Sequence, residues 1–344
     1  MLGKLSYLYF PIAGEKGIKS CVTPNLAGDS KLNQETFILE PVSVENLHNN
    51  RSGRNFWCSI EGMGHWSVVG ASVEEEYKKF TEYQDKSVLT AGLMWHELER
   101  ESMKYQMKSK VTSFVPLEHD VEIMYVRLYN NGKKEKAVTS TAVVPIYGRS
   151  ADNIRDHRHV TSLLHQIETQ EDGVCVKPTM SFDERGHRKN NTTYFALGIT
   201  GDGRKPISFF PVVEDFIGEG GSYTNPRAIQ EKKDGVKAGQ YFEGKEALGG
   251  IRFETITLQP GEGAEYIVII GASELGTNDG MLALEEIMTE EEPATEGEIE
   301  DSKEEMEKES EAIEQETEKE SEAIEQAMKN RSEEESTTEE KMKE

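Results

Sequence analysis

The densest group of polar side chains in the sequence lies in residues 147–159, from Tyr147 to His159. Arginine guanidinium groups bind carboxylates, phosphates and sugar hydroxyls through several donors held in one plane. The segment therefore predicts either a loop that faces a ligand or a partner, or a salt-bridged loop that closes one end of the fold. A metal site is disfavoured, because the two histidines have no evident third ligand. The charged residues of the segment are Arg149, Asp152, Arg155, Asp156, His157, Arg158 and His159.

A second polar cluster occupies residues 46–57 and is followed closely by Trp66. Asparagine amides and arginine forks can hydrogen-bond paired sugar hydroxyls, and an indole ring can cover the apolar C–H face of a sugar. The cluster therefore predicts a carbohydrate platform. Turn-forming residues followed by core tryptophans are an equally open interpretation. The residues concerned are Asn49, Asn50, Arg51, Arg54 and Trp57.

A third polar turn, residues 183–188, contains the adjacent acids Asp183 and Glu184. Adjacent residues in a strand point to opposite faces, whereas the two carboxylates of a glycosidase flank one bond about 5–9.5 Å apart. A structural role is therefore favoured for this turn. The sequence also lacks the phosphate-loop, zinc-helix and nucleophile-elbow motifs. These observations predict no catalytic residues and no metal ligands in this chain.

Alternating apolar and polar residues dominate the elements that would position these clusters. Residues 120–130 and 133–147 read as two strands joined by Asn131-Gly132, which is a strong signal for a tight hairpin. Residues 251–258 and 264–270 predict a second hairpin. Further strands are expected at 5–10, 35–39, 193–198 and 208–213, and short helices at 73–85 and within 153–166.

Many strands and few helices predict an all-β fold, a large antiparallel β-sandwich with few short helices. We place this domain at residues 1–284. Residues 285–344 differ in kind, because their 26 acidic and 7 basic residues give a net charge of −19 out of −25 for the chain. An 11-residue repeat, 308–315 and again 319–326, keeps Ile313 and Ile324 on one helical face. The prediction is a solvated acidic tail, helical or disordered, with a weak helical partner segment as the alternative.

The three cysteines, Cys21, Cys58 and Cys175, are far apart and odd in number, which favours reduced thiols and a cytoplasmic setting. No stretch approaches the roughly 20 apolar residues of a membrane helix, so no membrane partner is expected. Strong net negative charge disfavours nucleic acid as a partner, because neutralising phosphates supplies most non-specific affinity for duplexes.

Five long motifs make the sequence resemble the N-terminal region of cellobiose-phosphorylase-related inverting glycoside phosphorylases. The closest resemblance is to the β-1,2-oligoglucan phosphorylase type, from about Leu5 to Ala272. The motifs are FPIAGEKG (10–17), VTPN (22–25), EPVSVENLHNNRSGRNFW (40–57), the segment YGRSADNIRDHRH and its continuation (147–165), and FDERGH (182–187).

This resemblance implies a β-sandwich, a helical linker and an (α/α)-barrel that holds the general acid for inverting phosphorolysis of a β-glucosidic bond. It implies no cofactor, with inorganic phosphate as co-substrate. No barrel follows the sandwich in this sequence, so we expect a non-catalytic fragment. The resemblance also implies residues that border a substrate or an interface: Asn49, Asn50, Arg51, Arg54, Arg149, Arg155, Asp156, His157 and Arg158.

Two functions remain open from the sequence. The first is the non-catalytic sandwich of a β-glucan or cellobiose-type phosphorylase, which can bind a β-glucan oligosaccharide and needs the missing barrel or a second subunit. The alternative is an interaction module that docks a partner subunit without binding sugar.

Overall fold

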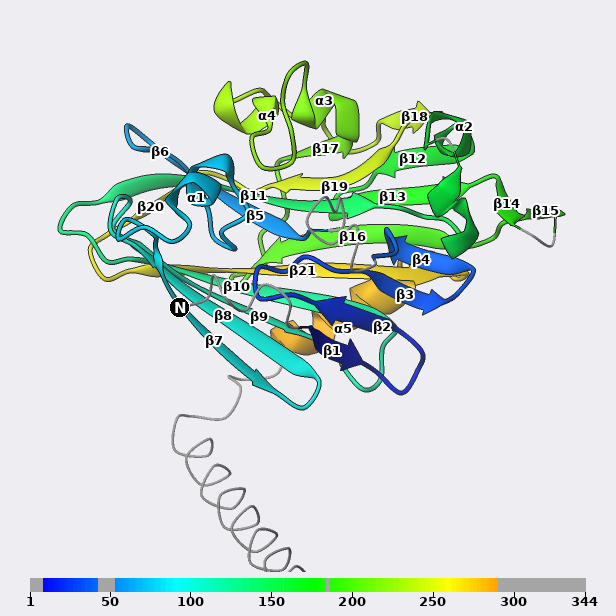
Figure 1. Cartoon of the computed structure of the whole chain (residues 1–344), viewed down its shortest axis with the longest axis horizontal. Coiled ribbons are helices and arrows are strands. Elements are labelled where there is room, and N and C mark those ends of the chain that lie inside the picture. The colour runs from blue at the N-terminus through cyan, green and yellow to red at the C-terminus, as the bar shows by residue number, and fades with distance from the viewer. Residues whose placement is uncertain (1–8, 43–52, 157, 184–185, 290–344) are drawn as a thin grey trace, which may run out of the picture. The chain divides into compact units, whose positions relative to one another are not determined.

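The computed structural model describes residues 9–42, 53–156, 158–183 and 186–289 (Figure 1). Strands dominate these residues, and they form four antiparallel sheets. The predicted all-β sandwich with few short helices is therefore confirmed. The predicted tail segment 290–344, with its 11-residue repeat, lies outside the described residues, as does most of the predicted strand at 5–10.

The largest sheet has nine strands, in the spatial order β18-β12-β13-β16-β21-β10-β9-β8-β7. Their bounds are β18 Tyr241–Glu243, β12 His165–Thr169, β13 Gly173–Pro178, β16 Thr193–Thr200, β21 Gly263–Ser273, β10 Val121–Asn130, β9 Met107–Phe114, β8 Trp95–Ser102 and β7 Lys86–Gly92.

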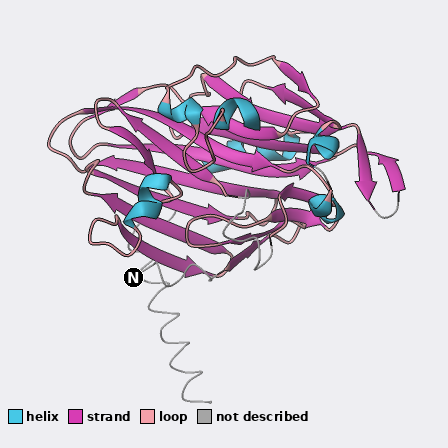
Figure 2. Ribbon diagram, turned by 45° about the horizontal axis from the view of Figure 1, so that its top comes forward, coloured by secondary structure: helices cyan, strands magenta, loops and turns pink. Residues whose placement is uncertain are grey.

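The second sheet has six strands, in the order β17-β19-β11-β5-β6, with β20 pairing to β11 off this path. Strands β13 and β16 of the large sheet contact β19 of this one, so the two sheets are stacked layers (Figure 2). The bounds are β17 Ser208–Val212, β19 Ala247–Arg252, β11 Lys136–Ile146, β5 Asn55–Ile60, β6 Gly64–Ser67 and β20 Ile256–Leu258.

A four-stranded sheet extends the second layer, because β1 contacts β8 and β9 while β4 contacts β21 and β11. It consists of β1 Phe10–Ala13, β2 Lys19–Val22, β3 Ser30–Asn33 and β4 Thr36–Leu39. A separate two-stranded hairpin, β14 Met180–Asp183 with β15 Gly186–Lys189, projects from one end of the sandwich (Figure 1).

The main core lies between the layers. Strand β9 shows period-2 alternation along its whole length, with Met107 and Val111 among the buried residues. Facing residues from the other layer include Phe56, Val144 and Ile251. Burying an aliphatic or aromatic side chain of this size contributes roughly 1.5–3 kcal/mol, so this interface dominates the stability of the fold.

Helices cover the two outer faces of the sandwich. Helix α5, Asn278–Thr289, packs on the outer face of the large sheet, where Leu284 joins a buried cluster with Phe195 and Ile267. Helices α3, Val213–Ile217, and α4, Arg227–Gln230, cover the outer face of the six-stranded sheet. The remaining helical pieces are α1 Val73–Lys78, η3 Ala151–Arg155 and α2 Arg158–Ser162.

Both predicted hairpins are wrong. Strands β10 and β11 belong to different sheets, as do β20 and β21, so each connection crosses between layers instead of turning back within one. Neither Asn131 nor Gly132 has the positive φ that a type I′ turn requires. Strand β10 instead pairs with the preceding β9 and with the distant β21, and β11 pairs with β5, β19 and β20.

Single elements match the sequence better. The strands expected at 35–39, 193–198 and 208–213 are confirmed as β4, β16 and β17. The helix expected at 73–85 is shorter, because α1 ends at Lys78 and Phe80 takes a left-handed φ of 64°. Helix α5 was not predicted, and it continues past residue 284, where the sequence pattern places the end of the sandwich.

Candidate functional site

Arg54 lies in the interior and not on a rim. Its side chain is fully buried, and two of its nitrogens each lie 2.6 Å from an oxygen of the buried Glu122 on β10. A third nitrogen donates to the carbonyl of Gly28 at 2.7 Å, and Ser20 donates to Glu122 at 2.5 Å. Arg54 therefore ties the four-stranded sheet to the large sheet.

A buried histidine lies close to this ion pair. Burial lowers the pKa of His96 to about 4, and the positive charge of Arg54 acts in the same direction. The imidazole is therefore neutral near pH 7, and it packs against the ring of Phe10 at a centroid distance of 5.1 Å. This polar group belongs to the architecture of the core.

Arg149 closes a narrow cleft at one end of the six-stranded sheet. The side chain is buried and its guanidinium stacks on the ring of Tyr147, 5.1 Å from the centroid. Glu246 and Tyr223 also line this cleft. The free space is about 10 Å³, which holds one water molecule at most, so a sugar ring does not fit inside.

The rest of the predicted loop is only partly described. Asp156 accepts a hydrogen bond from the Asn153 amide at 2.7 Å, which closes the short η3 helix. Arg155 and Arg158 belong to η3 and α2, but their side chains lie outside what the structure describes, as does all of His157. Asn49, Asn50 and Arg51 also lie outside the described residues. The structure thus brings Arg149 and Asp156 onto one loop and places Arg54 in the core.

The opposite end of the sandwich holds a much larger opening, which we name the hairpin cleft. It measures about 910 Å³ and lies among the turn after β5, the β8–β9 turn and the crossing between β10 and β11. The polar side chains that line it include Glu61, Glu101, Gln106, Asn131, Lys133 and Lys134, and Met63 and Met103 add apolar surface.

Lys136 forms a fixed part of this cleft. Its ammonium group donates to the carbonyl of Gln106 at 2.8 Å and to the side chain of Asn130. Asn130 in turn donates to the carbonyl of Leu258 at 2.9 Å. Burial lowers the pKa of Lys136. These bonds hold the crossing rigid, while Lys133 and Lys134 extend into solvent.

The hairpin cleft is not predicted from the sequence, because Asn131-Gly132 reads there as a tight turn and residues 133–147 as the strand that follows it. A signal was present, since three lysines and an asparagine follow one another closely between two strands. A loop with this density of donors is unusual for a turn that only reverses the chain.

Metal binding finds no support in the part of the chain that is described, where no group of three His, Cys, Asp or Glu residues is arranged to hold an ion. Among the same residues, no helix is long and apolar enough to cross a membrane.

Stacked antiparallel sheets with helices on their outer faces define an all-β sandwich. The chain belongs to the family described as glycosyl hydrolase 94, supersandwich domain, whose model matches residues 82–319. The family resemblance expected from the five motifs is therefore confirmed. No curated protein matches the sequence.

Solved structures show weaker similarity. A bacterial glucoamylase complexed with acarbose is 10% identical with a TM-score of 0.49, and the match covers 82% of this chain and 34% of the glucoamylase. This chain thus spans about a third of that enzyme. A putative aldose 1-epimerase from Escherichia coli K12 is 11% identical with a TM-score of 0.41, covering 77% of this chain and 99% of that one. Similarity at this level carries no information about activity.

Proposed function

We propose that this chain is the non-catalytic sandwich of an inverting β-glucan or cellobiose-type phosphorylase, and that it binds oligosaccharide in the hairpin cleft. The observation that carries the proposal is the family match, which extends from before β7 to beyond α5. In this proposal the general acid and the phosphate site belong to an (α/α)-barrel and not to the sandwich. The three cysteines are free thiols, which supports a role in carbohydrate metabolism in the reducing cytoplasm.

The hairpin cleft has the size and chemistry for part of a glucan chain. Its volume of about 910 Å³ lies within the range of roughly 300–1,000 Å³ that ligand sites occupy. Carboxylates, amides and ammonium groups provide both acceptors and donors for sugar hydroxyls. The fixed bonds of Lys136 and Asn130 hold the floor in place, which lowers the ordering cost of binding.

The opposite end supports docking of the catalytic domain. Three large apolar side chains, Ile154, Val160 and Leu163, are exposed there by 39%, 62% and 67%. They lie on the same loop as Arg149 and Asp156, and contiguous apolar groups bordered by charges are typical of interaction sites. This observation also favours the alternative function, an interaction module that docks a partner subunit without binding sugar.

The first test measures catalysis and sugar binding by the purified chain. With cellobiose or linear β-1,2-gluco-oligosaccharides plus inorganic phosphate, we expect no glucose 1-phosphate. Calorimetric titration with the same sugars should show binding that Glu101→Ala with Lys134→Ala weakens at least about tenfold, because charged groups make the stronger hydrogen bonds. The matched control is Glu15→Ala with Lys16→Ala, an exposed pair on the turn between β1 and β2.

Formation of glucose 1-phosphate by the chain alone would refute the non-catalytic role. Sugar binding that the cleft variant leaves unchanged would refute the hairpin cleft. Absence of any sugar binding, together with association of a recombinant family barrel that Val160→Ser with Leu163→Ser abolishes, would establish the interaction module instead.

A further inference from the structure

Three aromatic rings stand in solvent along a short segment after β6. Tyr77, Phe80 and Tyr83 are exposed by 83%, 77% and 73%. They are spaced three residues apart, from the last turn of α1 into the loop that leads to β7. Burying even one such ring is favourable, so three exposed rings in one segment need a reason. We name residues 77–83 the aromatic loop.

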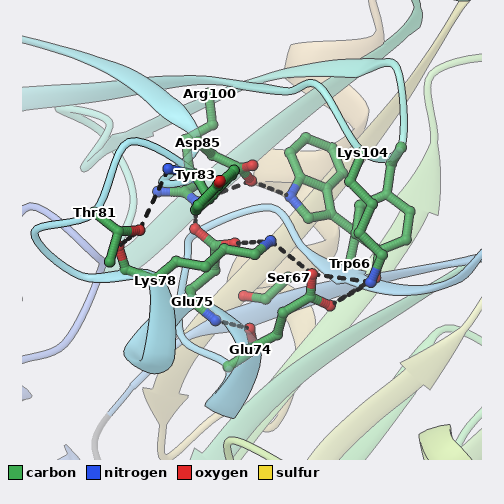
Figure 3. A network of polar contacts seen from close by, with 12 residues as sticks. Trp66, Ser67, Glu74, Glu75, Lys78, Thr81, Tyr83, Asp85, Arg100 and Lys104 are labelled. Atoms are coloured by element: carbon green, nitrogen blue, oxygen red, sulfur yellow. Dashed lines mark hydrogen bonds and ion pairs between the residues drawn. The ribbon is translucent and has the colours of Figure 1, made fainter.

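One guanidinium holds both ends of the aromatic loop (Figure 3). A terminal nitrogen of Arg100 on β8 lies 2.6 Å from Glu75, before the loop, and 3.2 Å from Asp85, after it. All three side chains are buried. Asp85 also accepts from the indole nitrogen of Trp66 at 2.9 Å, which ties the same anchor to β6.

Short-range bonds order the loop between these anchors. The Thr81 hydroxyl donates to the carbonyl of Lys78 at 2.7 Å and accepts from the backbone N–H of Tyr83 at 3.3 Å. Phe80 takes a left-handed φ of 64°, a conformation that residues with a side chain rarely adopt. The loop is therefore a constrained structure, and its constraints direct aromatic rings outward instead of into the core.

The residues between the rings indicate the kind of ligand. Lysines and glutamates alternate with the aromatic residues through this segment, in the order Glu76, Lys78, Lys79 and Glu82. The centre of a protein–protein interface is depleted in lysine and glutamate, so this pattern disfavours a protein partner. A sugar instead combines an apolar C–H face, which stacks on an aromatic ring, with hydroxyls at its edge that bond to charged groups.

We propose that the aromatic loop is a second sugar-binding surface, which takes β-linked gluco-oligosaccharide by stacking of Tyr77, Phe80 and Tyr83 on successive sugar rings. All hydroxyls of a β-linked glucosyl unit are equatorial, so both faces of its ring are apolar and flat. The choice of a β-glucan, though not the stacking surface itself, rests on the proposed function.

The aromatic loop and the hairpin cleft flank the same turn. Lys104 of the β8–β9 turn lies 2.8 Å from Glu74 of α1, and Tyr105 donates to Glu74 at 2.9 Å. Ser102 and Met103 of this turn line the hairpin cleft. The β8–β9 turn therefore lies between the hairpin cleft and the helix that leads into the aromatic loop.

The test titrates the full chain with cellohexaose and with linear β-1,2-glucohexaose, and uses maltohexaose as the α-linked comparison. The variant Tyr77→Ala, Phe80→Gly, Tyr83→Ala removes all three rings, and glycine accepts the left-handed φ at position 80. We expect its affinity for the β-linked hexasaccharides to fall at least about tenfold, since each stacked ring adds to binding. Its circular dichroism and melting temperature should match the parent.

The matched control removes three other exposed apolar side chains, Leu93, Leu117 and Leu275, by substitution with alanine and should bind as the parent does. Parent-like affinity of the aromatic-loop variant, or no binding of these sugars by the parent chain, overturns this inference. If the aromatic-loop variant loses sugar binding while the Glu101→Ala, Lys134→Ala variant binds as the parent does, the inference is supported. The same result refutes the hairpin cleft as the sugar site. Glucose 1-phosphate formation refutes only the non-catalytic role.

Discussion

The Arg54 guanidinium and the Glu122 carboxylate lie where water does not reach either charge. Removing a charge from water costs several kcal/mol, and this cost is offset only while the partner and additional hydrogen bonds are present. Here the carbonyl of Gly28 and the hydroxyl of Ser20 provide those bonds. The pair therefore links two sheets and tolerates the loss of neither partner.

Arg54→Met should destabilise the protein by about 3–5 kcal/mol, because it leaves the buried Glu122 carboxyl without its cation. The double variant Arg54→Met with Glu122→Gln should be less destabilised than the sum of the two single variants. Urea denaturation followed by circular dichroism measures both quantities. Arg204→Met, which removes an exposed pair with Asp202 and Glu254, should change stability by less than about 1 kcal/mol. Strictly additive losses would show that the two charges do not interact.

Sequence alone grouped Arg54 with its neighbours in the chain, because its partner lies 68 residues away. A local motif reveals that an arginine is present but not which distant carboxylate it meets. The surroundings of Arg149 are more local, because the ring that it stacks on, Tyr147, is two residues away. The polar loop predicted from this short segment is therefore present in the structure.

At the scale of elements, the same limitation explains the wrong hairpins. Short apolar runs predict the positions of β4, β16 and β17, which are buried along nearly their whole length. Pairing depends on the whole layer. Strand β10 lies between β9, which directly precedes it in the chain, and the distant β21, and its outer face meets the distant α5.

Helix α5 is attached to the sandwich through a histidine whose charge depends on pH. His119 bonds to Asp279 through Nδ1 and to Glu286 through Nε2, each at 2.9 Å. Burial alone lowers the pKa of His119, but the hydrogen bonds and negative charges of both carboxylates outweigh it and raise the pKa. A raised folded-state pKa stabilises the fold below the unfolded value near 6.5, and this contribution is lost as pH rises through the folded value.

We therefore expect the attachment of α5 to be weaker at pH 9 than at pH 6, by less than about 1 kcal/mol because Glu286 is largely exposed. Hydrogen exchange of the α5 amides, corrected for intrinsic rates, measures the change. His119→Gln should remove this difference in hydrogen exchange between pH 6 and pH 9. His187→Gln, on the separate β14–β15 hairpin, should retain the difference. If the His119 variant shows the same pH-dependent difference in exchange as the parent, the effect belongs to another titratable group.

At the scale of the whole molecule, α5 is part of the sandwich even though it follows the last strand. Its residues Ala283 and Leu284 are buried against the outer face of the large sheet, beside Phe195, Leu197 and Ile269. Without the helix this apolar face would meet water. The boundary that composition places at residue 284 cuts through the helix, because the acidic composition begins on the exposed face of α5 before the helix ends.

A chain that ends at Thr289 should therefore melt within about 2 °C of the full chain, since every buried cluster in the described residues lies before that point. A chain that ends at Thr277 should lose at least about 4 kcal/mol of unfolding free energy, because the outer face of the large sheet loses its cover.

Point variants test the same claim if the shorter chain does not fold. Leu284→Ala should cost about 2–4 kcal/mol and Leu282→Ala, exposed on the same helix, less than about 0.5. Equal stability of the two leucine variants would place α5 outside the cooperative fold. The sandwich would then end before residue 284.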